Sequence, residues 1–165
     1  MKRIIIILIL VLIVIQFFRP EKNVSAGPFP NDISTVYPVP QNISSMFEHA
    51  CNDCHSNNTR YPWYAEIQPV AWWLNDHVIE GKEELNFNEF ATYRASKQYK
   101  KLDEIGEMVQ KGEMPLKSYT LIHADARLSD ADKQAIMDWA NSTREIMQSK
   151  YPADSLTRPK PQRTQ

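Results

Sequence analysis

Cysteine is scarce in this chain of 165 residues, with only Cys51 and Cys54 present, both within one motif. No thiol remains to form a disulfide, and no second C-x-x-C completes a four-ligand zinc site. The other histidines, His49, His77 and His123, are scattered along the chain. The neighbourhood of Cys51 also lacks the alternating pattern of buried strands that surrounds a thioredoxin-like C-x-x-C. The sequence therefore disfavours disulfide, zinc and thioredoxin chemistry.

An excess of charge of one sign is also missing, because the formal net charge is −1. This balance provides no strong attraction to nucleic acid, and we expect no nucleic-acid partner. The length supports one domain with extra segments at its ends. Eleven prolines are present, and they cluster towards the two ends. The expected folded domain is therefore residues 41–149.

The residues around the two cysteines read Cys51-Asn52-Asp53-Cys54-His55. This is C-x-x-C-H, the attachment motif of c-type haem. Each thiol can add to one vinyl group of the same haem, and the following histidine can reach the iron as the proximal ligand. The sequence predicts one haem c per chain, covalently attached through Cys51 and Cys54, with His55 bound to the iron.

A second stretch, Gly112-Glu113-Met114-Pro115, predicts the other axial ligand. Met114 follows a predicted helix and precedes a proline, which fixes the local backbone and stops the helix. Its thioether is a soft donor that suits haem iron and raises the reduction potential. We predict Met114 as the sixth ligand, with His123 or an open, water-bound position as alternatives. His77, on a predicted helix, is more typical of a structural histidine.

Two further residues are candidates for contact with the haem. Trp63 lies in an aromatic cluster just after the motif, where its N–H could bond a propionate or its ring could pack on the porphyrin. Ordinary loop packing is an equal alternative. Arg127 could form a charge-assisted bond to a propionate, and the alternative is a solvated surface loop.

Apolar residues recur at helical spacing in the expected domain, and the predicted fold class is all-α. The first helix of the domain is expected over residues 43–51. A second begins near Pro69 and ends at Gly81, and a third ends at Gly112. The last begins with Ser129 as N-cap. Its apolar face consists of Ile136, Trp139, Ala140, Thr143 and Met147.

The N-terminal segment carries Lys2 and Arg3 before an apolar run from Ile4 to Ile15. We predict a signal anchor, or transmembrane segment, over residues 1–19. Its basic flank favours a single-pass inner-membrane protein whose haem domain faces the periplasm. The alternative is a cleaved signal, because Val24-Ser25-Ala26 resembles a cleavage site. Cleavage would release the protein into the periplasm.

Proline density sets the expectation for the two remaining segments. Residues 20–40 contain five prolines and predict an extended linker. Residues 150–165 contain three prolines among basic residues and predict a disordered tail.

Together these motifs resemble the bacterial haem-binding domain family of single-haem c-type proteins. Besides the haem motif, the resemblance rests on Tyr61-Pro62-Trp63-Tyr64, Leu85-Asn86-Phe87, Gly112-Glu113-Met114-Pro115 and residues 123–129, and it covers roughly residues 41–147. It implies a cytochrome-c-like helical domain packed around one covalent haem. The order of helix, haem motif, distal methionine and last helix is also similar to class I cytochromes c.

The function predicted from these features is electron transfer rather than enzymatic catalysis. A membrane-anchored periplasmic c-type cytochrome would pass single electrons between redox partner proteins of a respiratory chain. A haem peroxidase-like enzyme is one alternative, which requires a labile sixth ligand and an acid/base group such as His123. A haem-based gas or redox sensor is the other, although no output domain is recognisable.

Overall fold

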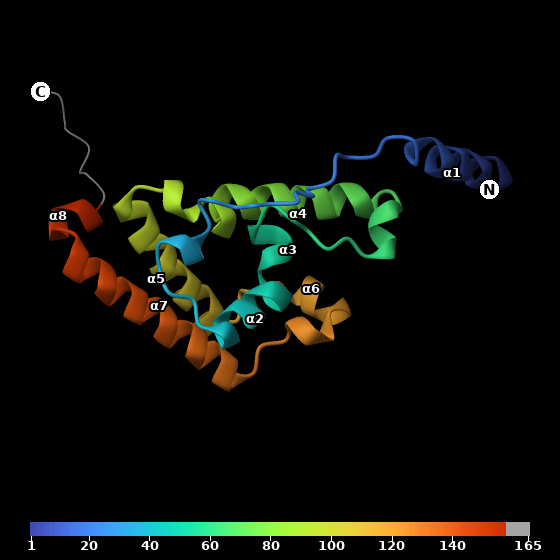
Figure 1. Cartoon of the computed structure of the whole chain (residues 1–165). Coiled ribbons are helices and arrows are strands. Elements are labelled where there is room, and N and C mark those ends of the chain that lie inside the picture. The colour runs from blue at the N-terminus through green and yellow to red at the C-terminus, as the bar shows by residue number, and fades with distance from the viewer. Residues whose placement is uncertain (158–165) are drawn as a thin grey trace, which may run out of the picture. The chain divides into compact units, whose positions relative to one another are not determined.

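The computed structural model describes residues 1–157, in which every regular element is a helix (Figure 1). The all-α prediction is therefore confirmed. The chain forms two compact units, each built from discontinuous segments. Unit 1 comprises residues 1–27 and 53–86, and unit 2 comprises residues 28–52 and those from 87 onward. These boundaries differ from the single domain expected over residues 41–149.

Unit 2 is centred on two long helices, α5 (Ala95–Lys111) and α7 (Asp130–Lys150), which lie side by side (Figure 1). Their apolar faces meet in the core, where the following residues are between 0% and 4% exposed: Leu102, Val109, Ile136, Ala140 and Met147. The predicted cap of α7 is confirmed. The Ser129 hydroxyl accepts from the N–H of Asp132 at 3.2 Å, and the Asp132 carboxylate accepts from the N–H of Ser129 at 2.9 Å.

Helix α2 (Gln41–Ala50) precedes the haem motif, as expected. Its buried face includes Ile43, Phe47 and Ala50. Phe47 stacks on Phe87 at 4.7 Å between ring centroids and meets Trp139 edge-on at 5.1 Å. These aromatic contacts add to the hydrophobic burial of α2 in unit 2.

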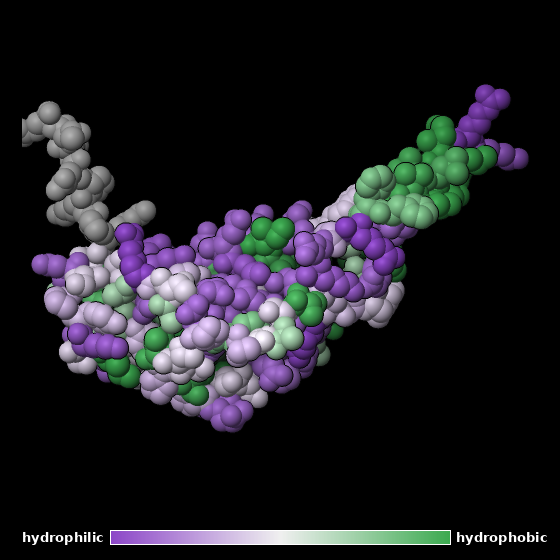
Figure 2. All heavy atoms as spheres, turned by 45° about the horizontal axis from the view of Figure 1, so that its top comes forward, coloured by the Kyte–Doolittle hydropathy of each residue, from purple (hydrophilic) through white to green (hydrophobic). Residues whose placement is uncertain are grey.

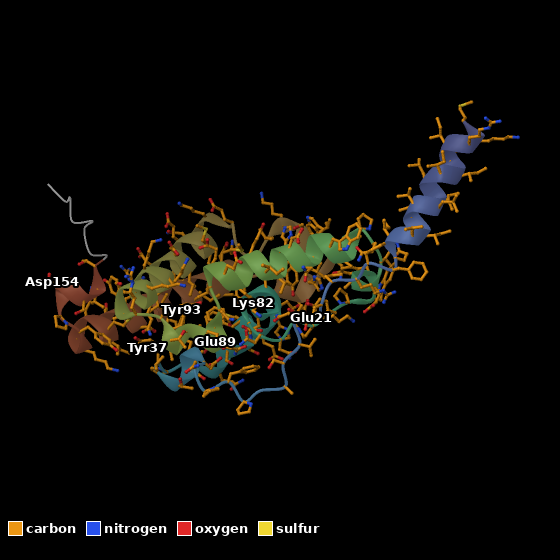
Figure 3. All side chains as sticks on the ribbon, turned by 90° about the horizontal axis from the view of Figure 1, so that it is seen from above. Glu21, Tyr37, Lys82, Glu89, Tyr93 and Asp154 are labelled. Atoms are coloured by element: carbon orange, nitrogen blue, oxygen red, sulfur yellow. The ribbon has the colours of Figure 1, made fainter. Side chains whose placement is uncertain are left out.

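The proline-rich segment before α2 is packed rather than free. It contains no α-helix, in keeping with its proline density, but only the short helix η1 (Ile33–Thr35). Tyr37, labelled in Figure 3, is 3% exposed and donates its hydroxyl to Oε1 of Gln98 at 2.6 Å. A free linker over residues 20–40 is therefore not what this part of the structure shows. Proline prevents helix formation, but it leaves apolar side chains able to pack.

The remaining elements of unit 2 are short. They are η3 (Phe87–Thr92), α6 (Lys117–Ile122), η4 (Ala124–Ala126) and α8 (Ala153–Leu156). Helix α8 packs against α5, and Leu156 is 8% exposed. The prediction of disorder is thus wrong for residues 150–157, because this segment forms a short helix and buries the side chain of Leu156. The rest of that predicted tail, residues 158–165, lies outside the described residues.

Unit 1 contains α1 (Lys2–Ile15), η2 (Trp63–Glu66) and α4 (Val70–Glu84). It also contains α3 (Asn52–His55) from Asp53 onward. The apolar side chains of α1 cover its visible surface (Figure 2), and from Ile4 to Val14 they are 50% to 62% exposed. Among the helices of residues 1–157, none combines the length and apolar character needed to cross a bilayer.

The segment after α1 is held against the rest of unit 1. The backbone N–H of Gln68 donates to Oε1 of Gln16 at 3.0 Å, and Nε2 of Gln16 donates to the carbonyl of Gln68 at 3.3 Å. Further along, the Asn23 side chain donates to the carbonyl of Ser56 at 2.9 Å and accepts from Lys82, labelled in Figure 3, at 2.6 Å. Residues 16–23 therefore form part of a packed surface in unit 1.

Candidate functional site

The C-x-x-C-H motif lies in the chain between the end of α2 and α3. Cys51 caps α2, and its N–H donates to the carbonyl of Phe47 at 2.9 Å. Cys54 and His55 are the last two residues of α3 in unit 1. The local fold thus follows the order expected from the sequence, a helix followed directly by the motif.

The ring of His55 is oriented by two backbone carbonyls. Its Nδ1 lies 2.8 Å from the carbonyl oxygen of Gly81 and 3.0 Å from that of Leu85. A carbonyl oxygen only accepts, so Nδ1 carries the hydrogen and donates, and in the neutral ring the lone pair is on Nε2. Such partners fix the orientation of a metal-binding histidine and strengthen it as a donor. Nε2 is therefore the atom suited to coordinate iron.

Gly81 has a different role from the one expected of it. The sequence predicted that it ends a helix, but α4 continues to Glu84. A Cβ at Gly81 would lie 2.7 Å from the carbonyl oxygen of Cys54 and 3.0 Å from its Cβ. Helix α4 can approach α3 this closely only because residue 81 has no side chain. The one signal in the sequence was an isolated glycine inside a helical pattern.

Asp53, a central residue of the motif, holds the loop that follows α3. It is 7% exposed, and its Oδ1 accepts from the backbone N–H of Arg60 at 3.0 Å and from Nε of Arg60 at 3.2 Å. The Thr59 hydroxyl donates to the backbone carbonyl of Asp53 at 2.6 Å. Nothing in the sequence predicted this role, because the two central positions of the motif carry no pattern of their own.

The surroundings of Cys54 keep its thiol protonated. Burial, together with the nearby carboxylate of Asp53, raises the pKa of the Cys54 thiol to about 11. At neutral pH the sulfur of Cys54 therefore remains a thiol and is not an activated nucleophile.

Met114 lies in the turn that follows α5, in unit 2. Helix α5 ends as predicted at Gly112, whose φ of 68° lies in the left-handed region. The N–H groups of Glu113 and Met114 both donate to the carbonyl of Met108, at 3.0 Å and 3.2 Å. These bonds place the half-buried Met114 at a defined position in the turn.

The other predicted residues make local contacts. His123 stacks on Tyr119 at 4.1 Å between ring centroids, and its Nδ1 lies 3.1 Å from the carbonyl of Tyr119. The Nε of Arg127 donates to the carbonyl of Thr120 at 2.9 Å, and its side chain is on the surface.

In unit 1, two more predicted residues also contact near neighbours in the chain. Nδ1 of His77 lies 2.8 Å from the carbonyl of Trp73, one helical turn earlier. Trp63 is 77% exposed and meets the ring of Tyr64 edge-on at 5.9 Å.

The donors in the chain fit a haem group. Two thiols at C-x-x-C spacing suit thioether attachment, an oriented imidazole suits the proximal position, and a methionine in a defined turn offers a thioether. Among residues 1–157, no group of three or more His, Cys, Asp or Glu side chains is arranged to hold a metal ion.

Comparison with known proteins identifies the family. The model of the haem-binding domain family matches residues 10–142. No curated protein and no solved structure matches the chain. The family match covers well over half of the sequence, and it includes the C-x-x-C-H motif and the Met114 turn. The chain therefore belongs to the haem-binding domain family.

Proposed function

We propose that this haem-binding protein is a c-type cytochrome that carries single electrons. In this proposal Cys51 and Cys54 would hold one haem covalently, and Nε2 of His55 and the sulfur of Met114 would be the ligands of its iron. The observation that carries the proposal is the pair of carbonyl contacts, at 2.8 Å and 3.0 Å, to Nδ1 of His55. When bound, the haem iron supplies a one-electron ferric/ferrous couple.

The residues of unit 1 keep the proximal side rigid. The carbonyls of Gly81 and Leu85 hold the imidazole in one orientation. The close approach at Gly81 fixes α4 against the backbone of Cys54. Because these contacts are made by main-chain carbonyls and a packed helix, we expect them to persist when the iron changes between its ferric and ferrous states. A rigid ligand environment keeps the reorganisation on electron transfer small.

In this proposal the protein is an electron carrier rather than an enzyme because Met114 is the sixth ligand of the iron. A thioether in the sixth position raises the reduction potential. It also occupies the site at which a peroxide or a gas would bind. The turn that follows Gly112 supports this role, because its hydrogen bonds to Met108 limit the movement of Met114.

We also propose that the apolar segment formed by α1 together with Phe17 and Phe18 beyond its end anchors the protein to the inner membrane, with Lys2 and Arg3 on the cytoplasmic side. The exposed apolar side chains around α1 support this role (Figure 2). The haem-binding part then lies in the periplasm, where it exchanges electrons with redox proteins of a respiratory chain.

The experiment that tests the carrier proposal compares absorption spectra of the oxidised and reduced full-length protein, produced in a periplasm with c-type maturation. We expect low-spin c-type bands and a methionine-to-iron charge-transfer band. That band should vanish in Met114→Ala and persist in Met137→Ala, a matched control because Met137 is also half-buried in unit 2. A high-spin ferric spectrum of the unsubstituted protein would contradict the carrier proposal and favour the peroxidase-like or sensor alternative.

A further inference from the structure

We propose that an apolar surface of unit 1, next to the end of α1, docks into the interface of the lipid bilayer. This surface, called here the aromatic collar, consists of Phe17, Phe18, Trp63, Ile67, Val70 and Trp73. Their exposed fractions are 83%, 63%, 77%, 45%, 36% and 49%. Soluble proteins rarely expose so many large apolar side chains in one region, and such patches mark interaction sites. The inference rests on the proposed membrane attachment of α1 and adds a second contact to it.

Hydrogen bonds join the collar to the end of α1. The carbonyl of Phe18 accepts from Nε1 of Trp72 and from Nε2 of Gln68, both at 2.8 Å. Glu66 pairs with Arg19 at 2.7 Å and also with Lys22. Because residues 16–22 are bound to residues 66–72 in this way, a bilayer that receives α1 must also meet the collar.

The chemistry of the collar suits the boundary between lipid and water. Trp side chains concentrate at this boundary, where the ring contacts apolar chains and the N–H reaches water or headgroups. Val70 and Trp73 are three residues apart at the start of α4, which places them on the same face of that helix. Arg19 and Lys22 share the single carboxylate of Glu66. Glu21 and Glu66 balance Arg19 and Lys22, so docking of the collar rests on its apolar side chains and not on charge.

The collar and the haem-holding residues occupy opposite ends of α4. Trp73 and Gly81 are separated by about 12 Å along the helix axis, at 1.5 Å per residue. The residues that orient His55 therefore lie about 12 Å along α4 from the docked side chains. Water-soluble redox partners can then approach that end of α4. This arrangement assigns Trp63 to the bilayer rather than to the porphyrin.

The test is photo-crosslinking of the full-length, haem-loaded protein in vesicles of radiolabelled phosphatidylcholine and phosphatidylglycerol. The photoreactive residue p-benzoylphenylalanine replaces Trp63, Trp73, Val11 or Ile79, one position at a time. Ile79 is the matched control, because it lies on α4 beyond Trp73 and is 48% exposed against 49% for Trp73. We expect several-fold more lipid adduct at positions 63 and 73 than at position 79, and strong adduct at position 11.

The positions separate failure of this inference from failure of the membrane anchor. Lipid adduct at position 11, with positions 63 and 73 no higher than position 79, would overturn the collar and leave the anchor standing. Adduct of position 63 with the porphyrin instead of lipid would also overturn it. Absence of lipid adduct at all four positions would overturn both the docking of the collar and the membrane anchor. The haem spectrum of each variant reports whether the protein has folded.

Discussion

The close contact between α3 and α4 predicts that Gly81→Ala destabilises the protein. The added Cβ would lie 2.7 Å from the carbonyl oxygen of Cys54, against 3.4 Å for the shortest ordinary van der Waals contact. The two helices must therefore separate by roughly 0.7 Å to restore an ordinary contact. Overpacking of this kind typically costs about 1–3 kcal/mol. The same displacement lengthens the 2.8 Å contact between His55 and the Gly81 carbonyl.

Gly106→Ala is the matched control for this prediction. Both glycines lie inside helices, so both substitutions gain about 1 kcal/mol of helix propensity. A Cβ at Gly106 meets only Cγ of Met137, at 4.0 Å. The difference between the two variants in the free energy of unfolding therefore isolates the crowding at Gly81, which we expect to be about 1–3 kcal/mol. Urea denaturation of the haem-loaded protein measures it.

A second readout connects the crowding to the site. Displacement of the Gly81 carbonyl weakens the hold on His55, so we expect a shifted reduction potential in Gly81→Ala and none in Gly106→Ala. Equal stability and equal potential in the two variants would refute the role assigned to Gly81.

Two further predictions concern polar contacts. Asp53→Ala removes the acceptor for two N–H groups of Arg60, so we expect the free energy of unfolding in urea to fall by about 1–2 kcal/mol. Arg60→Ala should lower it less, because the hydrogen bond from the backbone N–H remains. An Asp53→Ala variant as stable as the parent would contradict the role of this carboxylate. Ser129→Ala removes the cap of α7 and should cost about 1 kcal/mol at neutral pH. Hydrogen bonds from Ser129 lower the pKa of Asp132. The stabilisation that these bonds to the carboxylate provide is therefore complete above the ordinary aspartate pKa, and it is lost as the pH falls through the lowered pKa. The difference in unfolding temperature between the parent and Ser129→Ala should therefore shrink at acidic pH. A difference that stays constant as the pH is lowered would argue against the capping box.

Local signals in the sequence were sufficient for part of this structure. The capping residues at Ser129 and the left-handed glycine at Gly112 mark helix ends through contacts within a few residues. The C-x-x-C-H motif likewise follows a helix in sequence and in structure. Such features depend on neighbours along the chain, and a periodicity argument can therefore find them.

Contacts between distant segments explain what the sequence did not reveal. The close approach of Gly81 to Cys54 and the carbonyl contacts of His55 join α4 to α3, more than twenty residues away in the chain. Tyr37 packs in a segment whose prolines predicted only an extended chain. In each case the contact depends on a partner that is distant in the chain, and the local sequence pattern does not identify that partner.

The bond between protein and haem is tested most directly by the intact mass of the full-length chain under denaturing conditions, after production with c-type maturation. Covalent attachment through Cys51 and Cys54 predicts that one haem mass stays with the unfolded chain and is lost in the Cys51→Ser, Cys54→Ser double variant. Release of haem from the unsubstituted chain on denaturation would contradict c-type attachment.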